Sequence, residues 1–408
     1  MYLVGACRSA IGKMTGSLYG QDPVDIASQV IRGGFPEALL QKVDAVVLGN
    51  AVSAGLGQNI ARQIALAAGI PLEVPSYTVG MVCGSGMQAI RSAMGEVRDG
   101  AQLVLCGGIE WMSDIPFALD ASLRGGHRMG SMEMTDLMIR DGLTDAGSGV
   151  HMGITAENVA RRLGISREEQ DDYAHTAQQR AIAAVDGGAF REEIVPVRLQ
   201  LPKGKTAVFE TDEQINRGST REKLATLRPA FLRDGTGTVT AGNASGINDG
   251  CAFLLLASEE LCRREALPMD MEVVCGTAAG VDPLEMGLGP VAAIRRLLEK
   301  TGVSLEEVGA LELNEAFAAQ ALGCLHLLSR EHGVDMKTLL ERTNPLGSGI
   351  GLGHPLGASG ARIVVTLCHR MRRGDISLGL ASLCIGGGQG EALLLRHASR
   401  EANPVHKN

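Results

Sequence analysis

Residues 80–90 read GMVCGSGMQAI: a glycine turn around Cys83 leads into apolar residues at the spacing of an α-helix. Residues 353–363, GHPLGASGARI, place the same Ser-Gly pair at the start of a second helical pattern. In both stretches another glycine follows the pair 14 residues later, and then comes an apolar strand that ends in glycines, at 103–108 and 378–388. The sequence therefore predicts a turn–helix–strand unit that occurs twice.

A second pair of matching segments lies earlier in each unit. VDAVVLGNA at 43–51 corresponds to VGALELNEA at 308–316, so two matches occur in the same order along the chain. Strands that alternate with helices indicate parallel pairing and a sheet covered on both faces, which is the α/β class. The alternative is that α/β units look alike without duplication. We expect two similar βαβ-type halves.

The middle of the chain has a different character. Residues 119–248 include an early segment rich in Gly, Arg and Met, and their second half is irregular. Between these parts, Ser166 and Glu169 have the spacing of a capping box, which predicts a helix to about residue 185. This region is interpreted as a large insertion. The expected parts are residues 1–118 with 249–268 as the N-terminal half, 119–248 as a loop domain, and 269–408 as the C-terminal half.

Composition argues against several classes of protein. Hydrophobic residues make up 45% of the 408 residues and charged residues 21%, which suits a folded chain with a large core. The net charge of −8 and the 3% of aromatic residues argue against binding to nucleic acid or to an anionic membrane. The chain has no charged-then-apolar leader and no apolar run of spanning length, so we expect a soluble cytoplasmic protein.

The cysteines and histidines give no sign of a disulfide framework or a metal site. Nine cysteines are scattered along the chain, an odd number, and no C-x-x-C pair occurs. The nine histidines are also dispersed, so a zinc site is not expected.

Two residues have the chemistry of a nucleophile and its base. Cys83 would lie at the positive end of a helix, where free backbone N–H groups favour a thiolate. The alternative for a free cysteine is a small buried hydrophobe. His354 occupies the turn of the second unit that corresponds to the turn of Cys83. If the halves face each other, His354 can serve as the base of Cys83; otherwise it is an ordinary turn histidine.

Two further positions suit the same chemistry. Cys384 ends a strand before three glycines, whose free N–H groups could bind an oxyanion. The alternative is a strand-end cysteine with a flexible loop. Asn314 and Glu315 follow a strand, at the sheet edge where α/β proteins bind ligands. The alternative is that either of them caps the next helix.

Four motifs carry a resemblance to a known family. They are VCGSGMQAI at 82–90, NEAFA at 314–318, GHPLGASGAR at 353–362 and CIGGGQG at 384–390. Together they resemble the motifs of the thiolases, in the acetyl-CoA C-acyltransferase group. Further matches extend the resemblance over essentially the whole chain: RSAIGK at 8–13, GGIEWMS at 107–113, HMGITAENVA at 151–160, LRPAF at 227–231 and TVTAGNASGINDG at 238–250.

The resemblance implies a thiolase fold, a layered αβαβα core with the loop domain inserted in the first half. It also implies a role for each matching residue. Cys83 is acylated by an acyl-CoA, His354 takes its proton, and Cys384 acts as acid or base on the second substrate. One oxyanion site uses His354 with a water held by Asn314, and the other uses the N–H groups of Cys83 and Gly386.

The same resemblance implies that acyl-CoA and CoA are the small-molecule partners and that no cofactor is needed. The residues expected to bind substrate are His151, Met152, Arg217, Leu227, Ala241, Ser245, Ala316 and Phe317. The family often has an arginine where Asn216 stands, so Arg217 is the expected substitute. Residues 198–233 carry eight Lys or Arg against four Asp or Glu, and this excess of positive charge suits the binding of phosphate groups. The segment 123–145 resembles a tetramerisation segment, so we expect a homo-oligomer, either a dimer or a dimer of dimers.

The expected reaction is acetyl-CoA C-acetyltransferase chemistry, the condensation of two acetyl-CoA to acetoacetyl-CoA or its reverse, through an acyl-cysteine. A degradative 3-ketoacyl-CoA thiolase with longer substrates is the closest alternative. A condensing enzyme of the ketoacyl-synthase type would not need the second cysteine, Cys384. A non-enzymatic lipid carrier with this fold would not need all four motifs.

Overall fold

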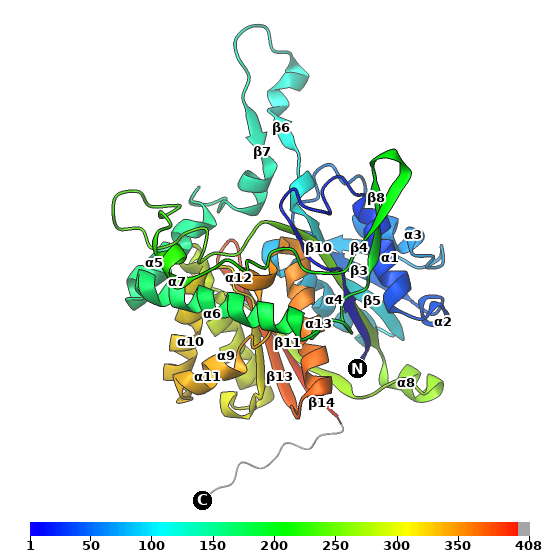
Figure 1. Cartoon of the computed structure of the whole chain (residues 1–408). Helices are drawn as coiled ribbons and strands as arrows, with labels where there is room; N and C mark the ends of the chain where they lie inside the picture. Colours follow the sequence, from blue (N-terminus) through cyan, green and yellow to red (C-terminus); the bar gives the residue numbers. More distant parts are fainter. Residues whose placement is uncertain (399–408) are drawn as a thin grey trace, which may run out of the picture.

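The computed structural model describes residues 1–398, so the last ten residues of the expected C-terminal half lie outside the described residues. Its centre is a 10-stranded sheet in which nine strands follow the order β12-β13-β14-β11-β1-β10-β5-β3-β4, and β2 pairs with β10 (Figure 1). These strands are β1 (Tyr2–Arg8), β2 (Gly12–Lys13), β3 (Ala45–Gly49), β4 (Ser76–Val79), β5 (Leu103–Trp111), β10 (Asn248–Ala257), β11 (Met271–Gly280), β12 (Ala310–Leu313), β13 (Leu378–Ile385) and β14 (Gln389–His397).

The sheet has the same pattern of pairing on both sides of its middle. Strand β3 is parallel to β5, which is antiparallel to β10, and β10 is antiparallel to β1. On the other side β12 is parallel to β13, which is antiparallel to β14, and β14 is antiparallel to β11. The two sides meet where Tyr2 of β1 pairs with Glu272 of β11. The two similar halves predicted from the repeated segments are confirmed.

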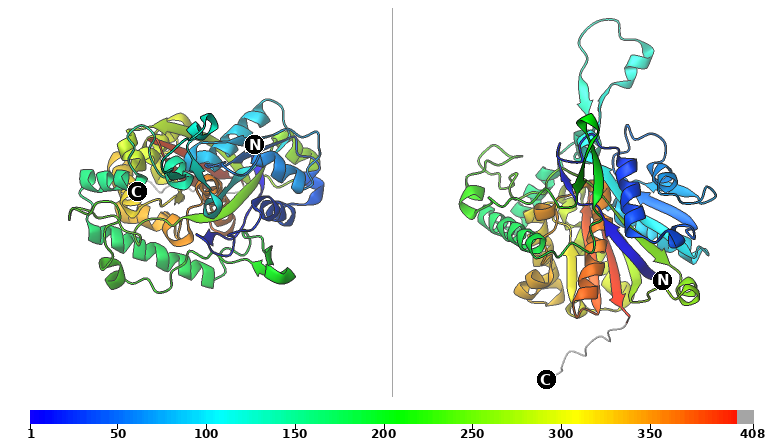
Figure 2. Two further views of the ribbon diagram at one scale, coloured as in Figure 1. Left: turned by 90° about the horizontal axis from the view of Figure 1, so that it is seen from above. Right: turned by 45° about the vertical axis from the view of Figure 1, so that its right-hand side comes forward.

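The helices form three layers, and the two halves of the sheet lie between these layers (Figures 1 and 2). The central layer holds α4 (Ser85–Arg98) and α13 (Leu356–Arg373), whose apolar residues share one core with strands of both halves. One outer layer contains α1 (Pro23–Gly34) and α3 (Ile60–Ala67), and the other contains α9 (Gly289–Thr301), α10 (Ala318–His332) and α11 (Met336–Arg342). The remaining helices are α2 (Glu37–Leu40), α5 (Met152–Leu163), α6 (Arg167–Asp186), α7 (Arg221–Ala225), α8 (Glu259–Glu265) and α12 (Gly349–Leu352).

Glycines bring the two central helices into direct backbone contact. A Cβ atom at Gly86 of α4 would lie 2.8 Å from the carbonyl oxygen of Gly357. A Cβ atom at Gly360 of α13 would lie 2.5 Å from the backbone nitrogen of Met87. Any side chain at these positions would force the helices apart. The Ser-Gly pairs seen in the sequence are therefore the point at which the two repeated units touch.

The inserted region covers one end of this core. Helix α6 begins with the predicted capping box, in which Ser166 and Glu169 each bond the other's backbone N–H group. Strands β8 (Val197–Leu201) and β9 (Lys205–Phe209) form a small hairpin. Strands β6 (Phe117–Leu119) and β7 (Met134–Asp136) form the base of an arm that projects away from the body (Figure 2). Within residues 1–398, none of the helices combines the length and the apolar character needed to cross a bilayer.

Candidate active site

Cys83 lies in a strained turn at the start of α4. The 3-10 turn Val82–Gly84 joins directly to the helix, and Val82 has a φ of 47°, which is unusual for a β-branched residue. The Ser85 hydroxyl holds the turn, because it accepts from the Met81 N–H at 2.8 Å and donates to the Val82 carbonyl at 2.7 Å. Strain that is held in this way is typical of functional sites.

The structure corrects the expectation that Cys83 rests as a thiolate. Cys83 is 8% exposed, and its burial raises the pKa of the thiol to about 12. The N–H groups of Gly386 and of Cys83 itself point at the sulfur and act against this effect, but they do not overcome it. Resting Cys83 is therefore protonated, and a base must take its proton during any reaction.

Cys384 lies beside Cys83, at the end of β13. Its side chain is fully buried, and burial together with the neighbouring Cys83 thiol holds its pKa well above the ordinary value. The loop after Cys384 brings the Gly386 N–H to the sulfur of Cys83. The two cysteines, which come from different halves of the chain, thus lie in one site and both rest as thiols.

His354 lies on the turn before α13, and α13 also packs against the Val82–Gly84 turn. Its Nδ1 atom is 2.6 Å from the Ser359 hydroxyl, and the Asn314 side-chain nitrogen is 3.3 Å from Nδ1 and 3.5 Å from Nε2. Burial, with a smaller effect of the Arg362 charge, lowers the pKa of His354 to about 3. The imidazole is therefore neutral at rest, with one ring nitrogen unprotonated.

Arg362 contacts the side-chain oxygen of Asn314, whose side-chain nitrogen faces His354. Its Nη2 donates to the Ser348 hydroxyl at 2.8 Å and to Asn314 Oδ1 at 3.4 Å, and its side chain is buried. Burial lowers the pKa of Arg362, and the charge of Glu312 is the largest effect that acts against this. Asn314 does not cap the following helix, because α10 begins four residues later, after Phe317. Sequence reasoning did not identify Arg362 as a site residue. The one signal for it is that it ends the GHPLGASGAR motif.

Three of the residues expected to bind substrate lie around Cys384. Met152, Ala316 and Phe317 share a buried apolar cluster with this cysteine. Phe231 joins the cluster: its ring stacks on His151 at 4.7 Å and meets the Phe317 ring edge-on at 6.4 Å. Phe231 was not among the predicted site residues, although it ends the LRPAF motif.

A cavity of about 300 Å³ lies next to this cluster. Among the residues that line it are Asn216, Lys223, Leu227, Ala241 and Ala244. The cavity adjoins the cluster at Ala244, which pairs with Phe317, and the next residue, Ser245, donates its N–H to the Ala316 carbonyl at 2.9 Å. Arg217 does not line this cavity; its guanidinium is paired with Asp186, 2.6 Å away.

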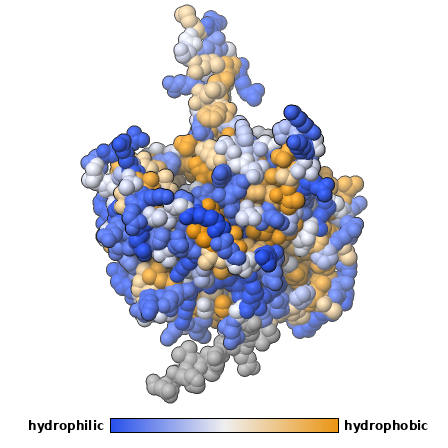
Figure 3. Space-filling model, viewed as in Figure 1, coloured by the Kyte–Doolittle hydropathy of each residue, from blue (hydrophilic) through white to orange (hydrophobic). Residues whose placement is uncertain are grey.

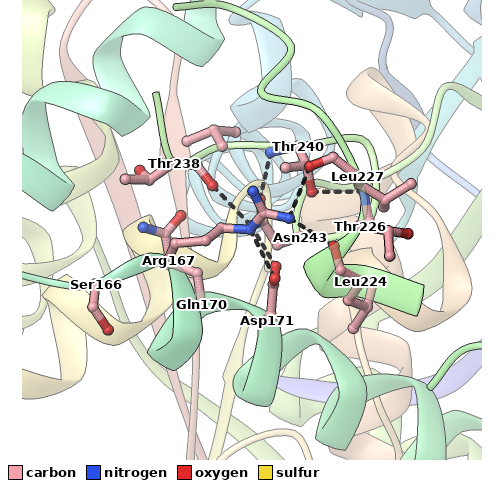
Figure 4. Close-up of polar contacts among 12 residues, drawn as sticks. Ser166, Arg167, Gln170, Asp171, Leu224, Thr226, Leu227, Thr238, Thr240 and Asn243 are labelled. Carbon is pink, nitrogen blue, oxygen red and sulfur yellow. Dashed lines mark hydrogen bonds and ion pairs between the residues drawn. The ribbon is translucent and has the colours of Figure 1, made fainter. Parts of the chain in front are cut away.

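Figure 4 shows a polar network that fixes the wall of this cavity. The Arg167 guanidinium binds the Asp171 carboxylate at 2.7 Å and the carbonyl oxygens of Leu224 and Leu227 at 2.6 and 3.0 Å. The Asn243 side chain donates to Asp171 at 2.9 Å and accepts from the Thr240 N–H at 2.8 Å. Helix α6 therefore holds both loops that supply Leu227 and Ala241.

The site combines a thiol, a neutral imidazole, a second thiol and backbone N–H groups aimed at the first sulfur. This set suits acyl transfer through a thioester, because the imidazole can take the proton of the nucleophile and the N–H groups can bind an oxyanion. Among residues 1–398, no group of three or more His, Cys, Asp or Glu side chains is arranged to hold a metal ion.

Comparison with known proteins gives a consistent result. Residues 1–260 match the family model "Thiolase, N-terminal domain", and residues 268–397 match "Thiolase, C-terminal domain". Proteins named acetyl-CoA acetyltransferase from Pseudomonas aeruginosa and Escherichia coli are 48% and 46% identical, over 96% of this chain and 98% of theirs.

Two solved structures have the same fold. The Bacillus anthracis acetyl-CoA acetyltransferase superposes with a TM-score of 0.90 at 43% identity, over 97% of this chain and 98% of its own. The human mitochondrial 3-ketoacyl-CoA thiolase also gives 0.90, at 37% identity and the same coverage. The expected fold is confirmed, and this chain belongs to the thiolase family.

Proposed function

We propose that this protein is an acetyl-CoA C-acetyltransferase, which interconverts two acetyl-CoA with acetoacetyl-CoA and CoA through an acyl-cysteine. One observation carries the proposal: the two thiols lie together, with backbone N–H groups on the first sulfur and a neutral histidine on the adjoining turn. The names of the relatives support the same activity.

The resting protonation states suit the cleavage direction. In the first step His354 takes the Cys83 proton, and the thiolate attacks the 3-keto carbon of acetoacetyl-CoA. The N–H groups of Cys83 and Gly386 stabilise the oxyanion. The bond between C2 and C3 then breaks, leaving acetyl-Cys83 and the enolate of acetyl-CoA. Cys384, a thiol at rest, protonates the enolate at carbon.

The second half-reaction restores the starting state. CoA enters as a thiol and gives its proton to the Cys384 thiolate. The CoA thiolate attacks acetyl-Cys83, and the departing Cys83 sulfur takes back the proton held by His354. Condensation is the same path in reverse, in which Cys384 removes the α-proton of acetyl-CoA. Asn314 and His354, which lie together, are proposed to bind the enolate oxygen.

The direct test is cleavage of acetoacetyl-CoA by free CoA, followed as the loss of enolate absorbance, together with mass analysis after incubation with acetyl-CoA. We expect turnover and one added acetyl group on the peptide that contains Cys83. Acetylation of a different cysteine would overturn the nucleophile. A rate that rises steadily from acetoacetyl-CoA to longer 3-ketoacyl-CoA substrates would identify a degradative thiolase instead.

The cavity that Leu227, Ala241 and Ala244 line is proposed to hold the pantetheine arm of CoA, with Lys223 and Asn216 nearest to the phosphates. Ser245, His151 and Met152 complete the proposed contacts with the thioester. The Arg217 contact stays a prediction. No cofactor beyond the CoA substrates is proposed.

The arm between β6 and β7 is proposed to join copies of this chain into a dimer of dimers. Its side chains include Phe117, Met129 and Met134, which are 62%, 91% and 67% exposed, and Figure 3 shows apolar side chains along it. Exposed apolar groups on a projecting arm are typical of an interface. Light scattering of the intact protein tests this assembly.

The nine free cysteines suit a reducing compartment, which supports a cytoplasmic location.

A further inference from the structure

Ser359 makes two short contacts on the turn that carries His354. Its hydroxyl oxygen lies 2.6 Å from His354 Nδ1 and 2.8 Å from the carbonyl oxygen of Pro355. The serine is in the first turn of α13, and both Ser359 and His354 are buried. Buried polar atoms at such distances are hydrogen-bonded, so the protons of this group can be assigned.

Only one arrangement of protons satisfies both contacts. A carbonyl oxygen can only accept, so the single hydroxyl proton of Ser359 must go to Pro355. The hydroxyl oxygen then accepts from His354, which requires the imidazole proton to be on Nδ1. With the proton on Nε2, the hydroxyl would have to donate to Nδ1, and two oxygen atoms would face each other at 2.8 Å with no proton between them.

The other neighbours of His354 do not change this assignment. The Asn314 side-chain nitrogen is nearly equidistant from the two ring nitrogens, at 3.3 and 3.5 Å, so it lies against the ring and selects neither. Burial, and to a smaller degree the positive charge of Arg362, both disfavour a positive imidazole. A carboxylate in place of Ser359 would orient the ring equally well, but it would also stabilise the imidazolium.

We propose that Ser359 is a positioning residue that holds His354 as the Nδ1–H tautomer and so keeps the Nε2 lone pair free to take the Cys83 proton. This inference rests on the proposed function for its kinetic consequence, but the tautomer itself does not depend on activity. A neutral hydroxyl orients the base and leaves it uncharged, as the mechanism above requires.

The test compares Ser359→Ala with Ser28→Ala. Ser28 is a matched control, because it is also a buried helical serine whose hydroxyl bonds a carbonyl one turn earlier, that of Asp25 at 2.8 Å, but it lies in α1. Nitrogen-15 spectra of histidine-labelled protein report which ring nitrogen is protonated, and the His354 signals are assigned from their loss in His354→Gln. Rapid-quench mass spectrometry gives the rate at which acetyl-CoA acetylates Cys83.

We expect wild-type His354 to be protonated at Nδ1, and Ser359→Ala to shift it toward Nε2–H. Acetylation of Cys83 should slow by about 10- to 100-fold in Ser359→Ala, a loss within the range of general base catalysis, and should not change in Ser28→Ala. A wild-type His354 protonated at Nε2 overturns the inference, even if Ser359→Ala does not fold. An unchanged tautomer or acetylation rate in folded Ser359→Ala overturns it too. If wild-type protein shows the Nδ1–H signal but does not acetylate, the proposed function fails and the tautomer assignment stands.

Discussion

Replacement of Gly360 by alanine should harm both stability and catalysis, although helix propensity alone predicts the opposite. An alanine inside a helix is favoured over glycine by about 1 kcal/mol. At Gly360 the added Cβ would lie 2.5 Å from the Met87 backbone nitrogen, so the helices would have to separate by about 0.9 Å to reach an ordinary contact of 3.4 Å. Backbone atoms cannot rotate away as a side chain can.

The magnitude follows from two effects. Overpacking in a dense core costs about 1–3 kcal/mol, so we expect a net loss of up to about 2 kcal/mol after the propensity gain of about 1 kcal/mol. The same separation would move the turn of Cys83 away from the turn of His354, because each turn adjoins one of the two helices. A displacement near 1 Å can cost about 10²-fold in rate, so we expect turnover to fall by about that factor.

Gly95→Ala is the matched control. Gly95 lies in α4, and nothing comes within 4 Å of a Cβ placed there. That variant should gain about 0.5–1 kcal/mol and keep full activity. Urea unfolding and acetoacetyl-CoA cleavage measure both variants. If Gly360→Ala unfolds at the same urea concentration as wild type and turns over within about threefold, the argument from helix contact is wrong.

The remaining predictions concern the chemistry of the site. Cys384→Ala should still acetylate Cys83 from acetyl-CoA, with water in place of Cys384 as the proton donor to the departing CoA, but it should lose condensation; normal condensation would remove Cys384 from the mechanism. Because burial raises the pKa of Cys83 to about 12, its alkylation by iodoacetamide should rise about tenfold per pH unit from pH 7 to 9; a plateau in that range would show a thiolate at rest. Arg362→Lys should slow exchange of the acetyl-CoA α-proton with solvent by about 10-fold or more, because the Asn314 amide loses its donor. Arg370→Lys, on the same helix but bound to Glu312, should leave that exchange within about twofold, and equal losses in the two variants would mean a structural effect only.

Periodicity and turn chemistry account for the parts of the fold that the sequence predicts well. The strand expected at 43–48 is β3 at Ala45–Gly49, and the strand expected from 103 is β5. These segments are almost wholly apolar, and each contains glycine at or near its end, so local pattern and tertiary burial agree. The capping box at Ser166 is equally local, since all its atoms lie within four residues.

Properties that arise between distant segments were not predictable in this way. The protonation of Cys83 depends on how deeply the completed core buries it, and the position of the sulfur in a helix turn indicated the opposite. Arg217 pairs with Asp186, 31 residues away in the chain, and no local pattern indicates this contact. Phe231 joins the apolar cluster around Cys384 only because its loop folds back onto His151. No pattern along the chain carries such information.

The burial of Cys83 also affects how the enzyme withstands oxidative stress. Peroxide attacks thiolates that solvent can reach, and sensor cysteines combine a low pKa with exposure. Cys83 has neither property before substrate arrives, because it is 8% exposed and its thiol keeps its proton. The proposed nucleophile is therefore a poor target for sulfenic acid formation in the free enzyme, and in the proposed mechanism it loses its proton to His354 only for attack on a bound thioester.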